Sequence, residues 1–191
     1  ALEALREPLE TGRITISRAA RQAAFPARFQ LLAAMNPCPC GYLGAAAATG
    51  RQCRCTPEQV ARYQGKLSGP LLDRIDLRIE VLAVKPAELM AQPDGEASAV
   101  VAARVAAART RQIARQGLPN AQLDAAAIDQ HCRLDSAAAG FLRSAAERLG
   151  WSGRRLHRTV KVARTVADLA ASDAITVAHL AEALQAQRAL D

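Results

Sequence analysis

Four of the five cysteines in this chain stand in two close pairs, and no other feature restricts its folding as strongly. A C-P-C motif at residues 38–40 is followed by twelve residues and then by a C-R-C motif at 53–55. Four thiolates bind Zn²⁺ tetrahedrally at about 2.3 Å, and two pairs across a loop are the usual way to supply them. A disulfide-linked or redox-active pair and four incidental thiols are the alternatives, although a reducing cytosol disfavours disulfides. The pattern favours a structural zinc site whose ligands are Cys38, Cys40, Cys53 and Cys55.

The apolar run just before the first pair, residues 29–34, is typical of a buried β-strand. The run ends at Met35-Asn36-Pro37, where proline stops the strand and leaves the Asn36 amide at its carboxyl end. Ligands of open α/β sheets bind beyond the carboxyl ends of the strands. Asn36 is therefore a candidate for chemistry, and a buried capping asparagine is the alternative.

Several motifs in order give the chain a family resemblance. AAMNPCPCG, the C-R-C pair and LSGPLLDRIDL together resemble the magnesium-chelatase-like AAA+ ATPases, and specifically the ComM/YifB competence-protein group. The resemblance runs from LREPLETGRITISRA to KVARTVADL, which is nearly the whole chain. The sequence contains neither a GxxxxGK[ST] P-loop nor an acidic Walker B strand. Both are expected before residue 1, so the resemblance implies the C-terminal portion of a larger protein, inactive by itself.

Composition and charge narrow the class further. The net charge is +7, from 25 Lys and Arg against 18 Asp and Glu, and such a balance suits nucleic acid or nucleotide phosphates. Half of the residues are apolar but only 3% are aromatic, which favours helices packed through small side chains. There is no run of about 18 apolar residues and no signal-peptide pattern, so we expect a cytoplasmic protein without a membrane partner.

The expected fold is α/β followed by all-α. Residues 1–85 are predicted to be the C-terminal part of an AAA+ core that contains a hairpin, a sensor-1 strand, the cysteine insertion and an arginine-finger segment. Residues 86–191 are predicted to be a helical lid domain. The pattern predicts strands over 13–17, 29–34 and 76–84, and helices over 1–10, 57–66, 70–74, 97–116, 135–149, 153–171 and 177–190, with a short helix near Leu123.

A hairpin with a basic tip is predicted near the start of the chain. Residues 13–17 alternate polar and apolar side chains, and residues 23–25 are a candidate return strand. This places Arg18 and Arg21 at the tip, unless the segment is simply a solvated basic loop. The resemblance implies a hairpin that projects into a central pore, where both arginines would contact DNA phosphates.

By the same resemblance, three residues would meet ATP bound between neighbouring subunits of a ring. Asn36 matches the sensor-1 position, which orients the attacking water. Arg74, in LLDRID, matches the arginine finger that reaches into the adjacent subunit's site, and a planar guanidinium suits phosphoryl transfer. A surface pair of Arg74 with Asp73 is the alternative, and Arg154 matches the sensor-2 arginine.

Arg154 also stands out on physical grounds. Ser152 is a good N-cap, so Arg154 and Arg155 fall in the first turn of a helix. Cations in that turn oppose the helix dipole by roughly 0.3–1 kcal/mol each, so their presence suggests an anion nearby. A solvated basic face, continued by Arg158 and Lys161, is the alternative.

Together these features predict part of a ring-forming AAA+ ATPase, a hexamer that acts on DNA as a helicase or branch-migration motor in recombination or natural transformation. The whole protein would use ATP and Mg²⁺. The alternative is an ATPase subunit of a magnesium-chelatase complex that remodels a protein partner without DNA. A standalone zinc adaptor would require the matches at Asn36, Arg74 and Arg154 to be accidental.

Overall fold

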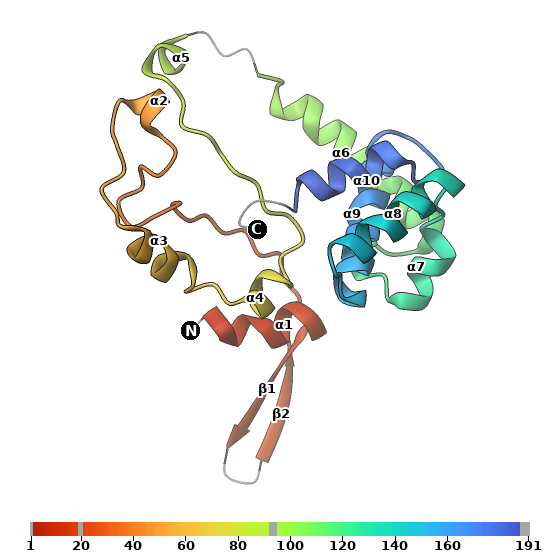
Figure 1. The fold of residues 1–191 in the computed structure, drawn as a ribbon. Coiled ribbons are helices and arrows are strands. Elements are labelled where there is room, and N and C mark those ends of the chain that lie inside the picture. The colour runs from red at the N-terminus through yellow and green to blue at the C-terminus, as the bar shows by residue number, and fades with distance from the viewer. Residues whose placement is uncertain (1, 19–20, 92–94, 188–191) are drawn as a thin grey trace. The chain divides into compact units, whose positions relative to one another are not determined.

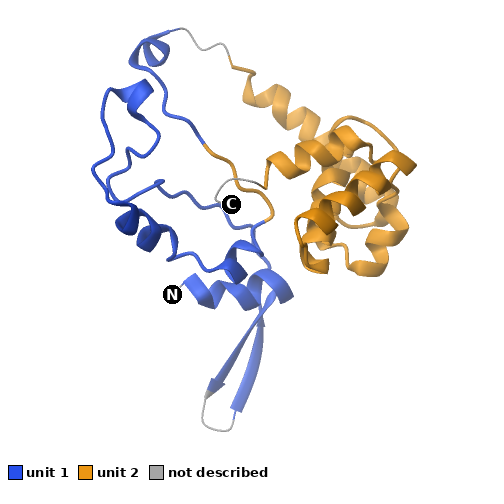
Figure 2. Cartoon of the chain, in the orientation of Figure 1, with its two compact units in different colours: residues 1–75, 81–92 blue, residues 76–80, 93–191 orange. Residues whose placement is uncertain are grey.

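The computed structural model describes residues 2–18, 21–91 and 95–187, and the chain divides into two compact units. Unit 1 comprises residues 1–75 and 81–92, and unit 2 comprises residues 76–80 and 93–191 (Figure 2). The predicted domain boundary between residues 85 and 86 stays a prediction.

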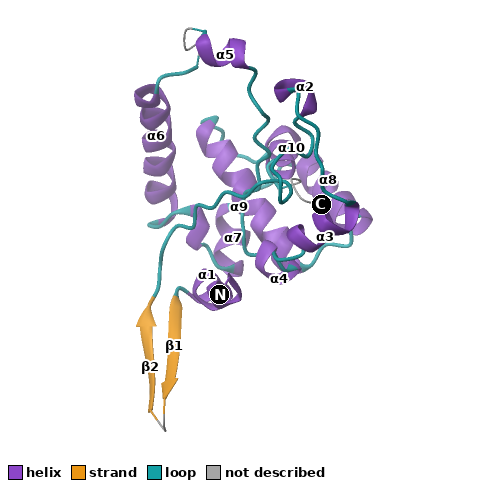
Figure 3. Ribbon diagram, turned by 90° about the vertical axis from the view of Figure 1, so that its left-hand side faces the viewer, coloured by secondary structure: helices purple, strands orange, loops and turns teal. Residues whose placement is uncertain are grey.

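Unit 1 begins with a short helical stretch that leads into a β-hairpin. The 3₁₀ helix η1 (Leu2–Leu5) continues into α1 (Arg6–Thr11), which ends where Gly12 adopts φ 67°. Strands β1 (Arg13–Arg18) and β2 (Arg21–Pro26) then pair antiparallel, with Arg13 opposite Pro26 and Arg18 opposite Arg21. The hairpin extends away from α1 (Figure 3), so the predicted hairpin is confirmed.

Short helices follow the hairpin in unit 1. They are α2 (Ala46–Thr49), α3 (Pro57–Gln64), α4 (Gly69–Leu72) and α5 (Pro86–Met90) (Figure 1). Thr56 and Gln59 form a capping box at the start of α3, which satisfies backbone N–H groups that a helix leaves unpaired. The Ser68 hydroxyl accepts from the Leu71 N–H and also from Arg6 Nη2, at 2.7 Å, which ties α4 to α1. The sequence predicted α3 and α4 but not α2 and α5.

The two strands predicted over 29–34 and 76–84 are not strands in this structure. Residues 27–36 and 77–85 have no regular secondary structure, and β1 and β2 are the only strands among the described residues. A strand needs a neighbour to take its backbone hydrogen bonds, and no described segment lies in register with either run. Their apolar side chains are accordingly exposed, with Leu32 at 94% and Val81 at 87%. The α/β class predicted for this part of the chain is therefore not confirmed.

Unit 2 is helical, as the sequence predicted. Its helices are α6 (Ser98–Gln116), η2 (Asn120–Gln122), α7 (Ala125–His131), α8 (Ser136–Arg148), α9 (Gly153–Leu169) and α10 (Val177–Gln185). The expected cap at Ser152 is confirmed, Asp135 likewise caps α8, and Gly117 ends α6 directly after the predicted range 97–116. The helix predicted over 135–149 ends at Arg148, and Leu149, which caps it, is 51% exposed. No helix in the described ranges is long and apolar enough to cross a membrane.

Helix α9 is the centre of unit 2 and contacts α6, η2, α7 and α10. One face of α9 is buried, and small residues such as Ala163 and Ala167, both fully inaccessible, allow neighbouring helices to approach closely. Cys132 belongs to this core, and burial is the main reason that its pKa is raised to about 11. The core cluster consists of Leu123, Ile128, Cys132, Ala138, Leu142, Val160, Ala163, Ala167, Ile175, Leu180 and Ala183.

A buried ionic network crosses this core. The Asp168 carboxylate, 1% exposed, accepts two hydrogen bonds from Arg115, at 2.6 and 3.0 Å, and one from the Asn120 amide at 2.8 Å. Arg164, also 1% exposed, lies 3.1 Å from the same carboxylate and donates to the carbonyls of Ser172 and Asp173. The network thus joins α6, η2 and α9 with the loop that follows α9.

The segment 76–80 is held by the helices of unit 2. The Arg78 N–H donates to the Ala186 carbonyl at 2.7 Å, and the Gln187 amide donates to the Asp76 carbonyl at 3.2 Å. Gln187 is itself buried and accepts from Thr159 of α9 at 2.8 Å. A segment that the sequence assigned to a sheet is therefore an attachment to the helical unit.

Candidate metal centre and nucleotide-site residues

The four paired cysteines come together in unit 1. Their Sγ atoms all lie within 4.8 Å of one another, and three of the separations are 3.4, 3.6 and 3.7 Å. None of the four is in a disulfide, so the structure does not support the disulfide alternative. Cys38 is fully buried, and Cys40, Cys53 and Cys55 are half-buried.

Tight turns and side-chain hydrogen bonds position these thiols. Gly41 has φ 82°, a left-handed conformation that a side chain disfavours, and its N–H donates to the Cys38 carbonyl at 3.1 Å. Gln64 on α3 donates to the Pro37 carbonyl at 3.0 Å, which anchors the helix to the first cysteine pair. The capping box at Thr56 starts α3 directly after Cys55. The C-P-C motif is thus held by the turn at Gly41 and by the hydrogen bond from Gln64, and the C-R-C motif is held by the start of α3.

The cluster fits a tetrahedral ion. Four sulfurs at about 2.3 Å from a central Zn²⁺ would lie roughly 3.8 Å apart, close to the observed separations. The structure therefore confirms that these cysteines converge into a group that can hold a metal such as zinc. Four protein ligands leave no open coordination position, which is the arrangement of a structural site.

The pKa values of the thiols also favour a metal ion at this cluster. Backbone N–H groups of Tyr42 and Arg54 are the main reason that the pKa of Cys40 is lowered to about 6. The Cys40 N–H lowers the pKa of Cys55, but burial and the three neighbouring thiols outweigh it and raise that pKa to about 12. Crowded thiols cannot all ionise together, whereas a divalent cation at their centre removes the repulsion.

Asn36 lies immediately before the cysteine loop and is exposed. Its side-chain carbon is 3.8 Å from the position that a Cβ on Gly41 would take, so the amide lies against the turn of the first cysteine pair. The alternative, a buried capping asparagine, does not match this exposure.

Arg74 lies just after α4 and is tied to α1. Its guanidinium forms an ion pair with Glu10 and donates to the Pro70 carbonyl at 2.6 Å, and its side chain is 17% exposed. The carboxylate that the structure shows beside Arg74 is that of Glu10, 64 residues away, and not that of Asp73 in the alternative surface pair.

Arg154 is exposed in the first turn of α9, in unit 2. Ser152 caps this helix by accepting from the Arg155 N–H at 3.3 Å, and the Arg155 guanidinium lies 5.4 Å from the centre of the Trp151 ring. The rest of the predicted basic face has partners within unit 2, because Arg158 pairs with Asp76 at 2.8 Å. Lys161 donates to the Ala121 carbonyl at 3.2 Å, and burial lowers its pKa.

The hairpin tip is described in part. The backbones of Arg18 and Arg21 face each other as the last pair of the ladder, and Arg21 is exposed. The side chain of Arg18 and residues 19–20 lie outside the described part of the chain.

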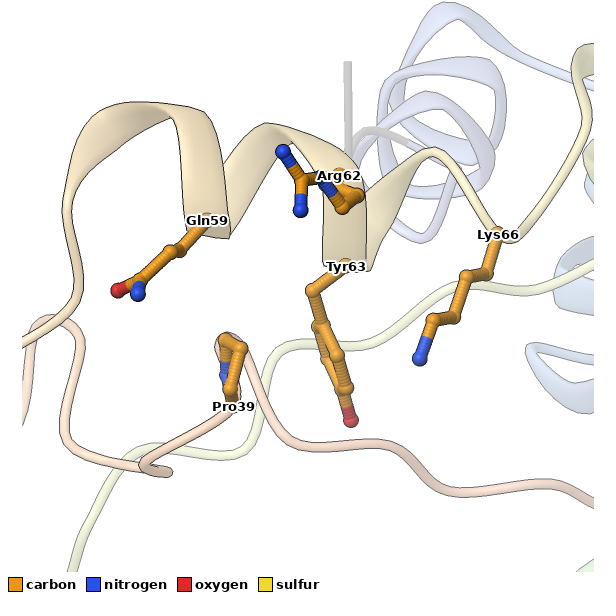
Figure 4. A pocket seen from close by; sticks show the side chains of 5 residues that line it. All are labelled: Pro39, Gln59, Arg62, Tyr63 and Lys66. Carbon is orange, nitrogen blue, oxygen red and sulfur yellow. The ribbon is translucent and has the colours of Figure 1, made fainter.

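A hollow beside the cysteine loop was missed by the sequence reasoning. It has a volume of about 390 Å³ and is lined by Pro39, Gln59, Arg62, Tyr63 and Lys66 (Figure 4). Lys66 lies over the Tyr63 ring, with its Nζ 5.4 Å from the ring centre. The available signal was the placement of both tyrosines of the chain, at 42 and 63, around the cysteine pairs.

Comparison with known families identifies the chain. The family described as magnesium chelatase, subunit ChlI, matches residues 1–89, and the C-terminal family of the same subunit matches residues 95–187. The chain belongs to the magnesium-chelatase family.

Relatives place it in the YifB and ComM group of this family. It is 49% identical over all of its length to YifB of Escherichia coli (strain K12). It is 48% identical over 96% of its length to the competence protein ComM of Haemophilus influenzae, and 42% identical over 96% to the protein Rv2897c of Mycobacterium tuberculosis. The chain spans only 35–37% of the length of these relatives. The roles of Asn36 as sensor 1, Arg74 as arginine finger and Arg154 as sensor 2 in this chain remain predictions. They rest on its resemblance to AAA+ ATPases.

Proposed function

We propose that this chain is part of a ring-forming AAA+ ATPase motor that acts on DNA. The observation that carries the proposal is its 48% identity, over nearly its whole length, to a protein named for competence. By resemblance, the motor is a hexamer in the cytoplasm that works as a helicase or branch-migration enzyme in recombination or natural transformation. It takes ATP and Mg²⁺ in the whole protein, and the chain by itself, without a P-loop in its sequence, does not hydrolyse ATP.

The hairpin supports the DNA assignment. Both strands of the hairpin are exposed to solvent over most of their length, and Arg18 and Arg21 form the last pair before the tip. Two cations at the end of a projecting ribbon suit contacts to phosphates, which would bind DNA without reading its sequence.

The nucleotide-site residues take the roles that the resemblance gives them. Asn36 orients the attacking water as sensor 1, Arg154 contacts phosphate as sensor 2, and Arg74 reaches into the neighbouring subunit as the arginine finger. The pair with Glu10 holds the Arg74 guanidinium at the surface of unit 1, so the finger must exchange this carboxylate for phosphate when it acts. This exchange preserves charge pairing, which limits its cost.

The cysteine cluster binds zinc, and this zinc is a structural ion. Cys38, Cys40, Cys53 and Cys55 would hold it, and its role is to fix the loop between Asn36 and α3. The predicted strands over 29–34 and 76–84 belong to the same proposal, as strands that pair only within a larger sheet. Exposed Leu32 and Val81 are consistent with surfaces that such a sheet would bury.

The second candidate is an ATPase subunit of a chelatase complex that remodels a protein and does not bind DNA. The description of the matching family as a magnesium-chelatase subunit favours it. The two candidates differ in one measurable property, which is affinity for DNA.

The test compares DNA binding of the wild type with a double variant at the hairpin tip. Fluorescence anisotropy with a labelled duplex should show sequence-independent binding that weakens with salt. Arg18→Ala with Arg21→Ala should reduce the salt slope by roughly 1–2 units, since each lost phosphate contact removes about 0.9. The matched control is Arg13→Ala, an exposed arginine at the base of the same hairpin, which should leave the slope unchanged.

Two results would contradict the proposal. A double variant that binds DNA like the wild type at every salt concentration would remove the hairpin from the interface. A wild type without affinity for any DNA would make the chelatase candidate the better one.

A further inference from the structure

We propose that the hollow beside the cysteine cluster binds single-stranded DNA by stacking a base on Tyr63. The binding surface, called here the Tyr63 surface, consists of Pro39, Gln59, Arg62, Tyr63 and Lys66. The inference rests on the proposed function for the nature of its partner, but it uses neither the hairpin nor the nucleotide-site residues. It therefore assigns a second contact with DNA to the cysteine module.

Both tyrosines of the chain lie in this part of unit 1, and each has a cation beside its ring. The sequence has two tyrosines, and both lie within residues 37–66, which contain the cysteine pairs and α3. A cation stands over each ring, with Arg51 and Lys66 each 5.4 Å from the ring centre of their tyrosine. Aromatic rings interleaved with cations are the combination that binds single strands, because bases stack on the rings and phosphates pair with the charges.

The two tyrosines differ in whether their rings are available for a base to stack on. The Tyr42 hydroxyl accepts from Arg51 at 2.5 Å, so this pair clamps the cysteine loop to itself. Tyr63 instead projects from α3 into the hollow, on the side where Pro39 lies (Figure 4). The side chain of Gln59 on α3 and that of Lys66, in the turn that follows α3, project to the same side. Tyr63 is therefore the ring on which a base can stack.

The cysteine cluster fixes the opposite wall of the hollow. Pro39 lies between two of the clustered thiols, Cys38 and Cys40, and its ring has no rotatable side chain. The hydrogen bond from Gln64 to the Pro37 carbonyl sets the distance between this wall and α3. Because the walls of the hollow are held in this way, little conformational entropy is lost when a DNA base enters it.

Charge makes a smaller contribution than stacking at this surface. Residues 37–66 carry four cations, Arg51, Arg54, Arg62 and Lys66, against one carboxylate, Glu58, for a formal balance of +3. Zinc on four thiolates would add a charge of −2 and reduce this balance to +1. Binding should therefore depend on the aromatic ring and tolerate any base sequence, with a shallow salt dependence of about 0.7 per phosphate contacted.

The experiment measures binding of a labelled oligothymidine to the zinc-loaded chain by fluorescence anisotropy. Tyr63→Ala should weaken binding by roughly 5- to 100-fold, which is the range for losing one stacked base. Tyr63→Phe keeps the ring and should bind within about twofold of the wild type. The matched control is Arg143→Ala, which removes an exposed cation from α8 in unit 2 and should leave affinity unchanged. Metal content and circular dichroism of Tyr63→Ala should equal those of the wild type, because the ring is not part of the cysteine cluster.

The outcomes separate this inference from the proposed function. Wild-type affinity for duplex but not for oligothymidine, or equal binding by Tyr63→Ala and the wild type, would overturn the Tyr63 surface and leave the motor proposal standing. Equal losses in Tyr63→Ala and Tyr63→Phe would overturn stacking as the mechanism. Tighter binding of oligouridine than of oligothymidine would overturn the choice of DNA as partner. Absence of binding to any DNA would overturn both proposals.

Discussion

The buried carboxylate of Asp168 should be the most sensitive single point in unit 2. Asp168→Ala removes the acceptor for Arg115, Asn120 and Arg164 at once. Breaking a buried ion pair by removing one partner destabilises by roughly 3–5 kcal/mol, because the remaining charge is left uncompensated. Arg164 has two carbonyl acceptors left and Arg115 is 25% exposed, so water and backbone can compensate part of the loss. We therefore expect the lower end, about 3 kcal/mol.

The chain offers a probe that reports on this unit alone. Its single tryptophan, Trp151, packs against the core of unit 2, so its fluorescence during urea unfolding follows this unit and not unit 1. The matched control is Asp129→Ala, an exposed acid on α7, which should change the free energy of unfolding by less than about 0.5 kcal/mol. A loss of less than about 1 kcal/mol for Asp168→Ala, with a native fluorescence spectrum, would refute the network as a source of stability.

The same residue predicts a dependence on pH. Burial raises the pKa of Asp168, but hydrogen bonds from Arg115 and Asn120 and the charge of Arg164 outweigh it, so the pKa in the folded state is lowered. A carboxyl with a lowered folded-state pKa stabilises fully above its unfolded pKa, and the contribution is lost as pH falls through the folded value. The difference in unfolding free energy between wild type and Asp168→Asn should therefore shrink on acidification. If this difference in unfolding free energy stays constant as the pH falls, the ionised Asp168 carboxylate is not the source of the stability.

The remaining predictions concern the cysteine loop, one helix end and the nucleotide. Elemental analysis of protein purified under reducing conditions should give about one zinc per chain. A zinc content below about a tenth of that value, with all four thiols free to titrate, would contradict the metal assignment. Ala171→Gly should raise the free energy of unfolding of unit 2 by about 0.5–1 kcal/mol, because Ala171 holds φ 56° after α9, and an unchanged value would show no strain there. Calorimetry of the chain alone should detect no ATP binding at millimolar nucleotide, since the sequence has no P-loop to cradle the phosphates, and a micromolar affinity would mean that the nucleotide binds elsewhere.

The sequence predicted those parts of the fold that are determined locally. The capped starts of α8 and α9, at Asp135 and Ser152, and the end of α6 at Gly117 follow from side chains within a few residues. Strands are different, because pairing depends on segments far away in the chain. The runs 29–34 and 76–84 have strand-like composition, but neither finds a partner among the described residues.

The same division applies to the candidate site. The convergence of the cysteines could be predicted because two close pairs across a loop have few other uses. Arg115 and Asp168 could not be paired from the sequence, since they stand 53 residues apart and each alone resembles a solvated charge. The sequence offered Asp73 as an alternative partner for Arg74, whereas the structure pairs Arg74 with Glu10, because α1 and α4 come together only in the fold. Tyr63 gave a weak signal, since a single ring acquires meaning only from Pro39 and Lys66 beside it.

The most direct test of the central claim is DNA-stimulated ATP hydrolysis by a protein extended to the full length of its relatives. Turnover should rise when DNA is added, and Arg74→Ala should lower it by roughly 10³-fold or more, as loss of an arginine finger does. DNA affinity of the same variant should stay near the wild-type value, because Arg74 is assigned to phosphoryl transfer and not to DNA. Hydrolysis that does not respond to DNA, or that survives in Arg74→Ala, would contradict the account of this chain as part of a DNA motor.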